Sequence, residues 1–249
     1  MRKKIVFFVL SVIIITFVFL YTPQTNRANE PCLANPIAHG TIIILNGVPS
    51  VGKTSIQKEL QEIMDEPYLS LGVDNMLIGT LPEKCMTGEF LKKDRPKNGI
   101  QGMHGYYDTN EQGKIFKLEF GPACRKLIRG MHRAFATMAD EKNSLIVDYI
   151  LYDQKWLPDL VDALYGYRVY FVGVKAPIDI VQKREKKRGT SPEGHARAYY
   201  DTVHKHGEYD LMVDTLQLSP KEAAEKIKEF IQQHPRPKAF KRLYKKLIQ

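Results

Sequence analysis

Eight consecutive residues of this 249-residue sequence match the pattern G-x-x-x-x-G-K-[ST]: Gly47, Val48, Pro49, Ser50, Val51, Gly52, Lys53 and Thr54. Gly47 and Gly52 can adopt backbone conformations that aim several N–H groups at one anion. The pattern predicts that Lys53 reaches the β- and γ-phosphates and that the Thr54 hydroxyl helps to hold Mg²⁺. These eight residues are therefore expected to bind a nucleoside triphosphate such as ATP, together with Mg²⁺.

The residues on either side of this loop have the composition of the strand and helix that such a site requires. Residues 41–45 form a short, β-branched apolar run that is typical of a buried parallel strand. Ile56, Leu60 and Ile63 recur at helical spacing after the loop. The N-terminal end of that helix, near Gly52, favours a bound phosphate. A strand, a glycine loop and a helix in this order predict a nucleotide-binding α/β domain.

Two aspartates follow further apolar runs that we expect to be strands. Asp74 follows residues 68–73, and Asp148 ends the run of residues 144–148. The carboxyl ends of parallel strands meet at one edge of a sheet, where ligands bind. Asp74 fits equally a general base that takes the proton of a substrate hydroxyl or the N-cap of the next helix. Asp148 fits the carboxylate that supports Mg²⁺ directly or through water.

A basic helix is expected after the apolar strand at residues 167–174. It begins near Pro177 and carries Arg184 and Arg188 in a run of charged residues. Such runs usually mark a solvated helix face, and that interpretation stands for the lysines of the run. In small kinases with a phosphate-binding loop, however, a basic helix closes over the phosphates as a lid. Arg184 and Arg188 are predicted to offset charge on the transferring phosphoryl group.

Several other features have less specific interpretations. Residues 80–118 are rich in glycine, proline and aromatic residues and fit either a flap that binds the acceptor or a plain insertion. Residues 110–114 have the composition of a hairpin turn. Cys124 fits a core or helix position. His204 and His206 fit loop or surface positions better than a pair of metal ligands.

The net charge of +9 is concentrated at the two ends of the chain. Residues 1–29 and 233–249 together hold ten basic residues and no acidic ones. Without them, the middle of the chain has 27 basic and 28 acidic residues. A near-neutral core argues against a nucleic-acid-binding domain, and the 43% hydrophobic content is that of a globular protein.

The ends of the chain predict segments outside the nucleotide-binding domain. Residues 1–21 contain three basic residues and then the apolar run 5–21, which fits an uncleaved membrane anchor or a cleaved signal sequence. The basic start predicts that the domain is exported, or secreted if the segment is cleaved. Residues 22–40 read as a linker. The basic tail, residues 233–249, fits a helix that touches a membrane surface or polyanion, or a frayed solvated helix.

The middle of the chain, residues 41–232, resembles chloramphenicol phosphotransferase-like proteins. The glycine loop is shared by many families, whereas the Gly-Val-Asp strand end and the Glu-Tyr-Asp-x-x-Val-Asp-Thr segment are more specific. The matching segments are residues 47–54, 71–74, 145–148, 171–174, 184–189, 203–204 and 209–215.

This resemblance implies a P-loop kinase fold, with a five-stranded parallel sheet flanked by helices and a helical lid. It implies Mg²⁺, ATP and phosphoryl transfer to the hydroxyl group of a small-molecule acceptor. The base of the family corresponds to Asp74, its phosphate-binding lysine to Lys53, and its lid arginines to Arg184 and Arg188. Thr54 supplies the hydroxyl at the end of the loop.

Two alternative functions remain open at this point. The first is a kinase whose acceptor is a nucleotide, a nucleotide sugar or an RNA end, as in zeta-toxin-like proteins, although the near-neutral core disfavours RNA. The second is a membrane-tethered nucleotide-binding protein without catalytic activity, since an exported domain would meet little ATP. The presence of Asp74, Lys53 and Arg188 argues against this second alternative.

Overall fold

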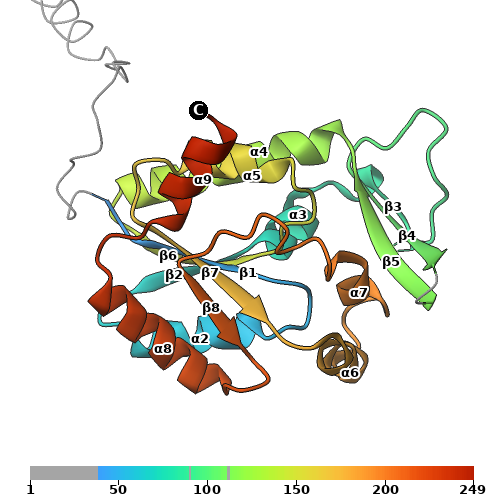
Figure 1. The fold of residues 1–249 in the computed structure, drawn as a ribbon. Helices are drawn as coiled ribbons and strands as arrows, with labels where there is room; N and C mark the ends of the chain where they lie inside the picture. The colour runs from blue at the N-terminus through green and yellow to red at the C-terminus, as the bar shows by residue number, and fades with distance from the viewer. Residues whose placement is uncertain (1–38, 90, 111–112) are drawn as a thin grey trace, which may run out of the picture. The chain divides into compact units, whose positions relative to one another are not determined.

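A five-stranded parallel sheet forms the centre of the fold in this computed structural model, which describes residues 39–89, 91–110 and 113–249. Its strands, in order across the sheet, are β2 (Tyr68–Gly72), β6 (Ser144–Tyr149), β1 (Ile42–Asn46), β7 (Val169–Lys175) and β8 (Leu211–Asp214) (Figure 1). All neighbouring strands run parallel. The predicted α/β fold with a five-stranded parallel sheet is therefore confirmed.

Helices cover both faces of this sheet. Helices α2 (Lys53–Ile63) and α8 (Pro220–Gln233) lie on one face, and α4 (Pro122–Asp140), α5 (Trp156–Ala163) and α9 (Ala239–Leu247) lie on the other. Because helices cover both faces, all five residues of β1 are buried, and buried and exposed positions do not alternate along this strand. Ser219 and Glu222 form a capping box at the start of α8. Cys124 is fully buried on α4, as expected for a core residue.

The strand order determines where a site can form. β1 pairs with both β6 and β7, so Asn46, Tyr149 and Gly173 lie at one level across the sheet. β2 pairs with β6, and Gly72 lies opposite Asp148. The segments that follow these strands therefore begin at the same edge of the sheet.

A second, smaller sheet and a helical segment lie beyond that edge. The small sheet contains β3 (Met86–Gly88), β4 (Met103–Asn110) and β5 (Gly113–Phe120), and Asn110 pairs with Gly113 as the predicted hairpin requires. Short helices α3 (Val73–Thr80) and η1 (Glu83–Cys85) connect it to β2. Residues 80–118 thus contain the three strands of this sheet, of which β5 extends to Phe120.

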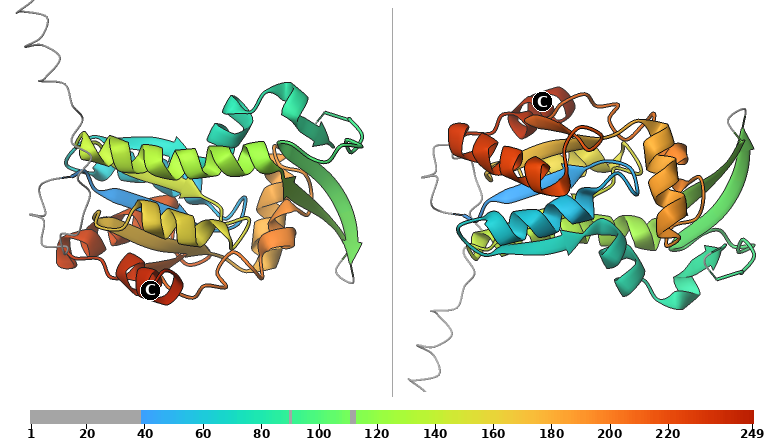
Figure 2. Two further views of the ribbon diagram at one scale, coloured as in Figure 1. Left: turned by 90° about the horizontal axis from the view of Figure 1, so that it is seen from above. Right: turned by 90° about the horizontal axis from the view of Figure 1, so that it is seen from below.

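Helices α6 (Ile178–Arg188) and α7 (His195–Tyr199) form the helical segment, and α7 contacts the small sheet. Both views in Figure 2 place the two side by side. The Phe116 amide donates to the Gly194 carbonyl at 3.3 Å, and the Leu118 amide donates to the Tyr199 hydroxyl at 2.8 Å. The segment expected to act as a lid is therefore attached to β5.

The C-terminal helix α9 is packed against the core. Ala239, Phe240 and Leu243 are buried, and the rings of Tyr165 and Tyr244 stack with centroids 3.7 Å apart. One carboxylate oxygen of Asp210 accepts hydrogen bonds from the backbone amides of residues 238 and 239, at 2.7 and 2.8 Å. The interpretation of the tail as a frayed helix is therefore wrong, while binding of a membrane surface or a polyanion by its basic residues stays a prediction.

The prediction of a membrane-anchored chain with an exported domain is corrected by the structure. Across residues 39–89, 91–110 and 113–249, no helix has the length and apolar composition needed to cross a membrane. The apolar segment 5–21, on which that prediction was based, lies outside the described residues, as does nearly all of the linker 22–40. Membrane anchoring through an N-terminal helix is therefore unsupported.

Candidate active site

The glycine loop joins β1 to α2 and has the backbone conformation of an anion-binding loop. Gly52 and Ser50 have φ angles of 113° and 60°, and the left-handed region is readily available to glycine. A Cβ atom at Gly47 would lie 2.4 Å from the Val174 carbonyl oxygen. Gly47 is therefore required by its close approach to β7, and Gly52 by its backbone angle.

Lys53 lies underneath this loop. Its ammonium group donates to the carbonyl oxygens of Gly47 and Val48, both at 2.9 Å, and lies 3.4 Å from Asp148 Oδ1. Only 4% of the side chain is exposed. The charge of Lys53 is thus held within the site by backbone oxygens and one carboxylate.

Thr54 and Asp148 meet at the start of α2. The Thr54 hydroxyl donates to Asp148 Oδ2 at 2.6 Å, so a strand-end carboxylate and a hydroxyl lie together as the sequence predicts. Such oxygen ligands suit Mg²⁺, which keeps few protein ligands and takes the rest from water and phosphate. The described residues contain no group of three or more His, Cys, Asp or Glu side chains that could hold a metal ion.

A second observation fits a bound polyphosphate. The Ser50 hydroxyl oxygen is buried within the glycine loop and has no hydrogen-bond partner among the described residues. Buried polar atoms in proteins almost always have a partner. A phosphate oxygen seated in the loop would supply one, so the donors present here fit a nucleotide phosphate.

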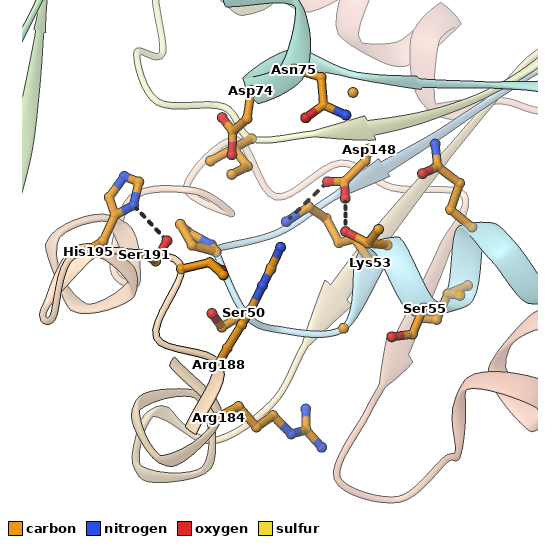
Figure 3. A pocket seen from close by; sticks show the side chains of 18 of the residues that line it. Ser50, Lys53, Ser55, Asp74, Asn75, Asp148, Arg184, Arg188, Ser191 and His195 are labelled. Carbon is orange, nitrogen blue, oxygen red and sulfur yellow. Dashed lines mark hydrogen bonds and ion pairs between the residues drawn. The ribbon is translucent and has the colours of Figure 1, made fainter. Parts of the chain in front are cut away.

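Asp74 lies in the first turn of α3, across the cavity from the glycine loop (Figure 3). The N-cap of α3 is Gly72, so the alternative interpretation of Asp74 as the N-cap is wrong. The Tyr152 hydroxyl donates to Asp74 Oδ1 at 2.9 Å. Burial raises the pKa of the Asp74 carboxyl above its usual value, against the opposing effects of Lys53 and the Tyr152 hydrogen bond.

The two arginines of α6 have different surroundings. Arg184 donates to the side-chain and carbonyl oxygens of Thr215, both at 2.8 Å, and to the Val51 carbonyl at 3.3 Å. The side chain of Arg188 is exposed, and among the described residues it has no hydrogen-bond partner. In Figure 3, Arg188 points toward Lys53, whereas Arg184 points away from it. Arg184 thus connects the loop to the end of β8, and Arg188 remains free to meet a ligand.

One cavity of about 820 Å³ contains all of these groups. Its loop half is formed by residues 49–50 and 52–57 with Asp148, Arg184, Arg188 and Thr215. Its apolar half is lined by Leu77, Ile78, Met103, Leu118, Ile150, Tyr152 and His195. Asp74 lies between the halves. Residues 80–118, which the sequence left open as flap or insertion, therefore contribute Met103 and Leu118 to the wall.

Aromatic side chains that belong to none of the sequence motifs pack together in the apolar half. The ring of His195 stacks on that of Tyr152, with centroids 5.6 Å apart and planes 6° apart. Phe116 and Tyr199 contact His195 edge-on, at 5.4 and 5.7 Å. Neither Tyr152 nor His195 could be predicted from the sequence, because the only local signal for either is an aromatic residue near a strand end or a helix start.

His204 and His206 lie away from this cavity and share one partner. Their rings lie 2.6 and 3.0 Å from the Tyr209 hydroxyl, which also accepts from the Asn46 side-chain amide at 2.7 Å. Asn46 in turn accepts the Leu151 amide at 3.0 Å. The two histidines therefore brace the end of β1 through Tyr209.

A family model described as chloramphenicol phosphotransferase-like protein matches residues 40–232. Two proteins from Mycobacterium tuberculosis, of strains CDC 1551 / Oshkosh and H37Rv, carry the provisional name O-phosphotransferase. Each is 29% identical over 214 residues, a match that covers 84% of this chain and 90% of the relative.

Solved kinase structures share the fold at low sequence identity. A sugar kinase from Janibacter sp. HTCC2649 has a TM-score of 0.52 and 15% identity, covering 79% of this chain and 96% of its own. The APS kinase of Mycobacterium tuberculosis, solved with AMPPNP and APS, has a TM-score of 0.51 and 15% identity, with coverages of 78% and 98%. A gluconokinase from Sinorhizobium meliloti 1021 has a TM-score of 0.50 and 12% identity, with coverages of 78% and 92%. The fold is therefore that of the P-loop kinases.

Proposed function

Since this chain belongs to the chloramphenicol phosphotransferase-like family, we propose that it is an ATP-dependent kinase that phosphorylates a hydroxyl group of a small, uncharged molecule. One observation carries the proposal: a carboxylate with a raised pKa, Asp74, faces the same cavity as the glycine loop. A base and a phosphate-binding loop that share one cavity are the two parts that transfer to an alcohol requires.

The loop half would hold the triphosphate. Free backbone amides of the glycine loop and the N-terminal end of α2, which begins at Lys53, would donate to its oxygens. Lys53 would exchange its bonds to the Gly47 and Val48 carbonyls for bonds to the outer phosphates. Mg²⁺, bound beside Thr54 and Asp148, would neutralise charge on the phosphate oxygens. These contacts would bring the γ-phosphoryl group toward the apolar half of the cavity.

Asp74 would act as the general base. Its Oδ1 atom is occupied by the Tyr152 hydroxyl, which leaves Oδ2 to accept the proton of the alcohol. As that proton moves to Asp74, the alcohol oxygen bonds to the γ-phosphorus. The bond from that phosphorus to the bridging oxygen breaks, and its electron pair leaves with ADP. The raised pKa makes Asp74 a stronger base than an ordinary aspartate.

The two arginines would contribute in different ways. Arg188 points toward Lys53 and is free to offset the negative charge of the phosphoryl group in transfer. Arg184 would act mainly by holding the loop against β8, because Thr215 and Val51 already occupy its guanidinium group.

The distribution of charge in the cavity supports an uncharged acceptor. Among the described residues that line it, the lysine and arginine side chains are those of Lys53, Arg184 and Arg188, all in the loop half. Burial lowers the pKa of His195 to about 4, so this ring is neutral near pH 7. An anionic acceptor would therefore lie beside the Asp74 carboxylate with no cationic side chain to pair with in the apolar half. Burying an unpaired charge in this way costs free energy. This argues against a nucleotide, a nucleotide sugar or an RNA end.

The test uses the full-length chain with ATP and Mg²⁺ and panels of uncharged alcohols and of nucleotides, with ADP release as the readout. Uncharged alcohols are expected to be phosphorylated in preference to nucleotides. Asp74→Asn should lower kcat about 10²–10⁴-fold, which is the usual contribution of a general base. Affinity for AMPPNP should stay within about threefold of wild type, because the loop half is intact.

Asp162→Asn is the matched control, since Asp162 is an exposed carboxylate on α5 outside the cavity. This variant should behave as wild type. If Asp74→Asn retains full turnover with an acceptor that the wild type phosphorylates, Asp74 is not the base. If the wild type binds nucleotide but phosphorylates none of the alcohols and none of the nucleotides, the chain is a nucleotide-binding protein without this activity.

A further inference from the structure

His195 lines the cavity with a ring nitrogen that has no partner. The residue begins α7, and only 5% of its surface is exposed. Its Nδ1 atom lies 3.5 Å from the Ser191 hydroxyl oxygen, whereas Nε2 is buried and has no hydrogen-bond partner among the described residues. Figure 3 shows the ring on the side of the cavity where Asp74 lies. A buried polar atom without a partner is rare, which points to a ligand atom as the missing partner.

The position of this ring is fixed from several sides. Tyr152 stacks on its face, while Phe116 and Tyr199 contact it edge-on. These contacts come from three separate parts of the fold, so the ring cannot turn Nε2 toward another group without disturbing them. The direction of Nε2 is therefore set before any acceptor binds.

The backbone on either side of His195 is also fixed. The buried carboxylate of Glu185 accepts the amides of Gly194 and Ala196, both at 2.8 Å. A carboxylate that accepts two backbone amides holds them firmly. Glu185 thus acts as a positioning residue for the histidine between them, from the same helix that carries Arg184 and Arg188.

An imidazole differs from a phenyl ring at this position only by its polar atoms. Since the cluster around it is aromatic, a phenylalanine would fill the space without burying an unpaired nitrogen. The ring is neutral near pH 7 and therefore has one N–H donor and one acceptor nitrogen. Such a group suits a hydrogen bond to an uncharged partner and requires no counter-ion.

We propose that His195 Nε2 hydrogen-bonds a second polar group of the acceptor, distinct from the hydroxyl group that faces Asp74. This inference rests on the proposed function and narrows its substrate class. The acceptor is an alcohol with an apolar body that Met103, Leu118 and Ile150 can contact, and with a neutral hydrogen-bonding group in addition to the reacting hydroxyl. His195 is thus a specificity-determining residue.

The first experiment measures this contact without any transfer. Full-length protein with ¹⁵N-labelled histidine is loaded with Mg²⁺ and AMPPNP and titrated with 2-phenylethanol, 2-(4-hydroxyphenyl)ethanol or 2-(4-acetylphenyl)ethanol. The Nε2 signal of His195, assigned by its loss in His195→Phe, is expected to shift with at least one of the two polar probes and not with 2-phenylethanol. Absence of a shift with all three probes overturns the proposal.

The second experiment measures kcat/KM for the same three alcohols in the wild type and in His195→Phe, which keeps the aromatic packing. The wild type is expected to prefer a polar probe about tenfold or more, as one hydrogen bond allows. His195→Phe should reduce this preference to within about twofold, mainly through a higher KM for the polar probe. His195→Gln, which restores a hydrogen-bonding group, should recover part of it.

His234→Phe is the matched control, because His234 is exposed and lies outside the cavity. It should keep the wild-type preference. If His195→Phe phosphorylates the probes with an unchanged preference, the inference fails while the proposed function stands. If the wild type phosphorylates no alcohol, the proposed function fails, and the ¹⁵N titration still decides whether His195 meets a polar ligand.

Discussion

The two halves of the cavity are built in opposite ways. The loop half comes mainly from one continuous segment, residues 47–54, and presents backbone amides and one buried ammonium group. The apolar half is assembled from side chains of α3, β4, β5, α7 and the residues that follow β6. A phosphate group can be held by local backbone geometry, whereas a wall of defined shape requires the whole fold. Each half therefore responds differently to substitution.

The largest expected effect of the loop half comes from Lys53. Lys53→Met removes the buried ammonium group that would hold the outer phosphates and should lower kcat about 10³-fold, as for other groups that stabilise developing charge. Lys58→Met is the control, because Lys58 is an exposed lysine on the same helix. Steady-state rates of ADP release measure both. Activity of Lys53→Met within tenfold of wild type would contradict the role assigned to the loop half.

Arg184 and Arg188 lie one turn apart on α6, but we expect them to have different roles. Arg188→Ala should lower kcat about 10²-fold, since it removes a free charge beside the phosphoryl group. Arg184→Ala should change kcat only a few-fold and mainly weaken ATP binding and thermal stability, because Arg184 bonds Thr215 and Val51. Steady-state rates and melting temperatures of the two variants measure these effects. If Arg184 were the residue that meets the phosphoryl group, Arg184→Ala would lower kcat more than Arg188→Ala does.

The pH dependence of the reaction tests the role of Asp74, which lies between the two halves of the cavity. The base form of Asp74 is needed, so kcat should fall about tenfold per pH unit below the pKa of this carboxyl. That fall should begin at a higher pH than for an ordinary aspartate, because burial raises the pKa. A pH–rate profile with no acidic limb above pH 4 would contradict this assignment.

The same shift has a consequence for stability. A carboxyl whose pKa is higher in the folded state binds its proton more tightly there, so its ionised form disfavours folding at neutral pH. Asp74→Asn should therefore raise the melting temperature at pH 7, and the gain should shrink as the pH falls through the pKa of Asp74. A melting temperature at pH 7 below that of the wild type would contradict the raised pKa.

The contrast between the halves also explains which parts of the site could be predicted from the sequence. The strand, glycine loop and helix around residues 41–63 were predicted from local pattern, and the structure places them as expected. Thr54 and Asp148 were each predicted to help hold Mg²⁺, and the structure places their side-chain oxygens 2.6 Å apart. The first prediction depends on geometry that neighbouring residues impose on one another, and the second on the rule that the carboxyl ends of parallel strands meet at one edge of a sheet.

The apolar half could not be predicted in the same way. Tyr152 and His195 are 43 positions apart, and their stacking depends on how α7 packs against the sheet. Met103 and Leu118 belong to a small sheet whose pairing is unrelated to the P-loop pattern. The choice between base and N-cap for Asp74 likewise required the observed start of α3 at Val73. Contacts of this kind are set by tertiary packing rather than by local propensity.

A substitution outside both halves should affect stability alone. Asp210 accepts the amides at the start of α9 and, through its other oxygen, the Phe171 amide at 3.0 Å. Asp210→Asn should cost about 1–2 kcal/mol of stability, as for the loss of a helix cap and a charge-assisted hydrogen bond. Activity per folded molecule should not change. Chemical denaturation and ADP release measure the two quantities, and a loss of kcat in the folded variant would link α9 to the cavity.

Both proposals require the loop half to hold a nucleoside triphosphate together with Mg²⁺. Titration calorimetry of the full-length chain with AMPPNP, and separately with GMPPNP, in the presence and absence of Mg²⁺ tests it most directly. We expect one molecule of at least one analogue to bind per chain, about tenfold or more tightly with Mg²⁺, because the cation offsets phosphate charge beside Thr54 and Asp148. The absence of Mg²⁺-dependent binding of either analogue would contradict the account.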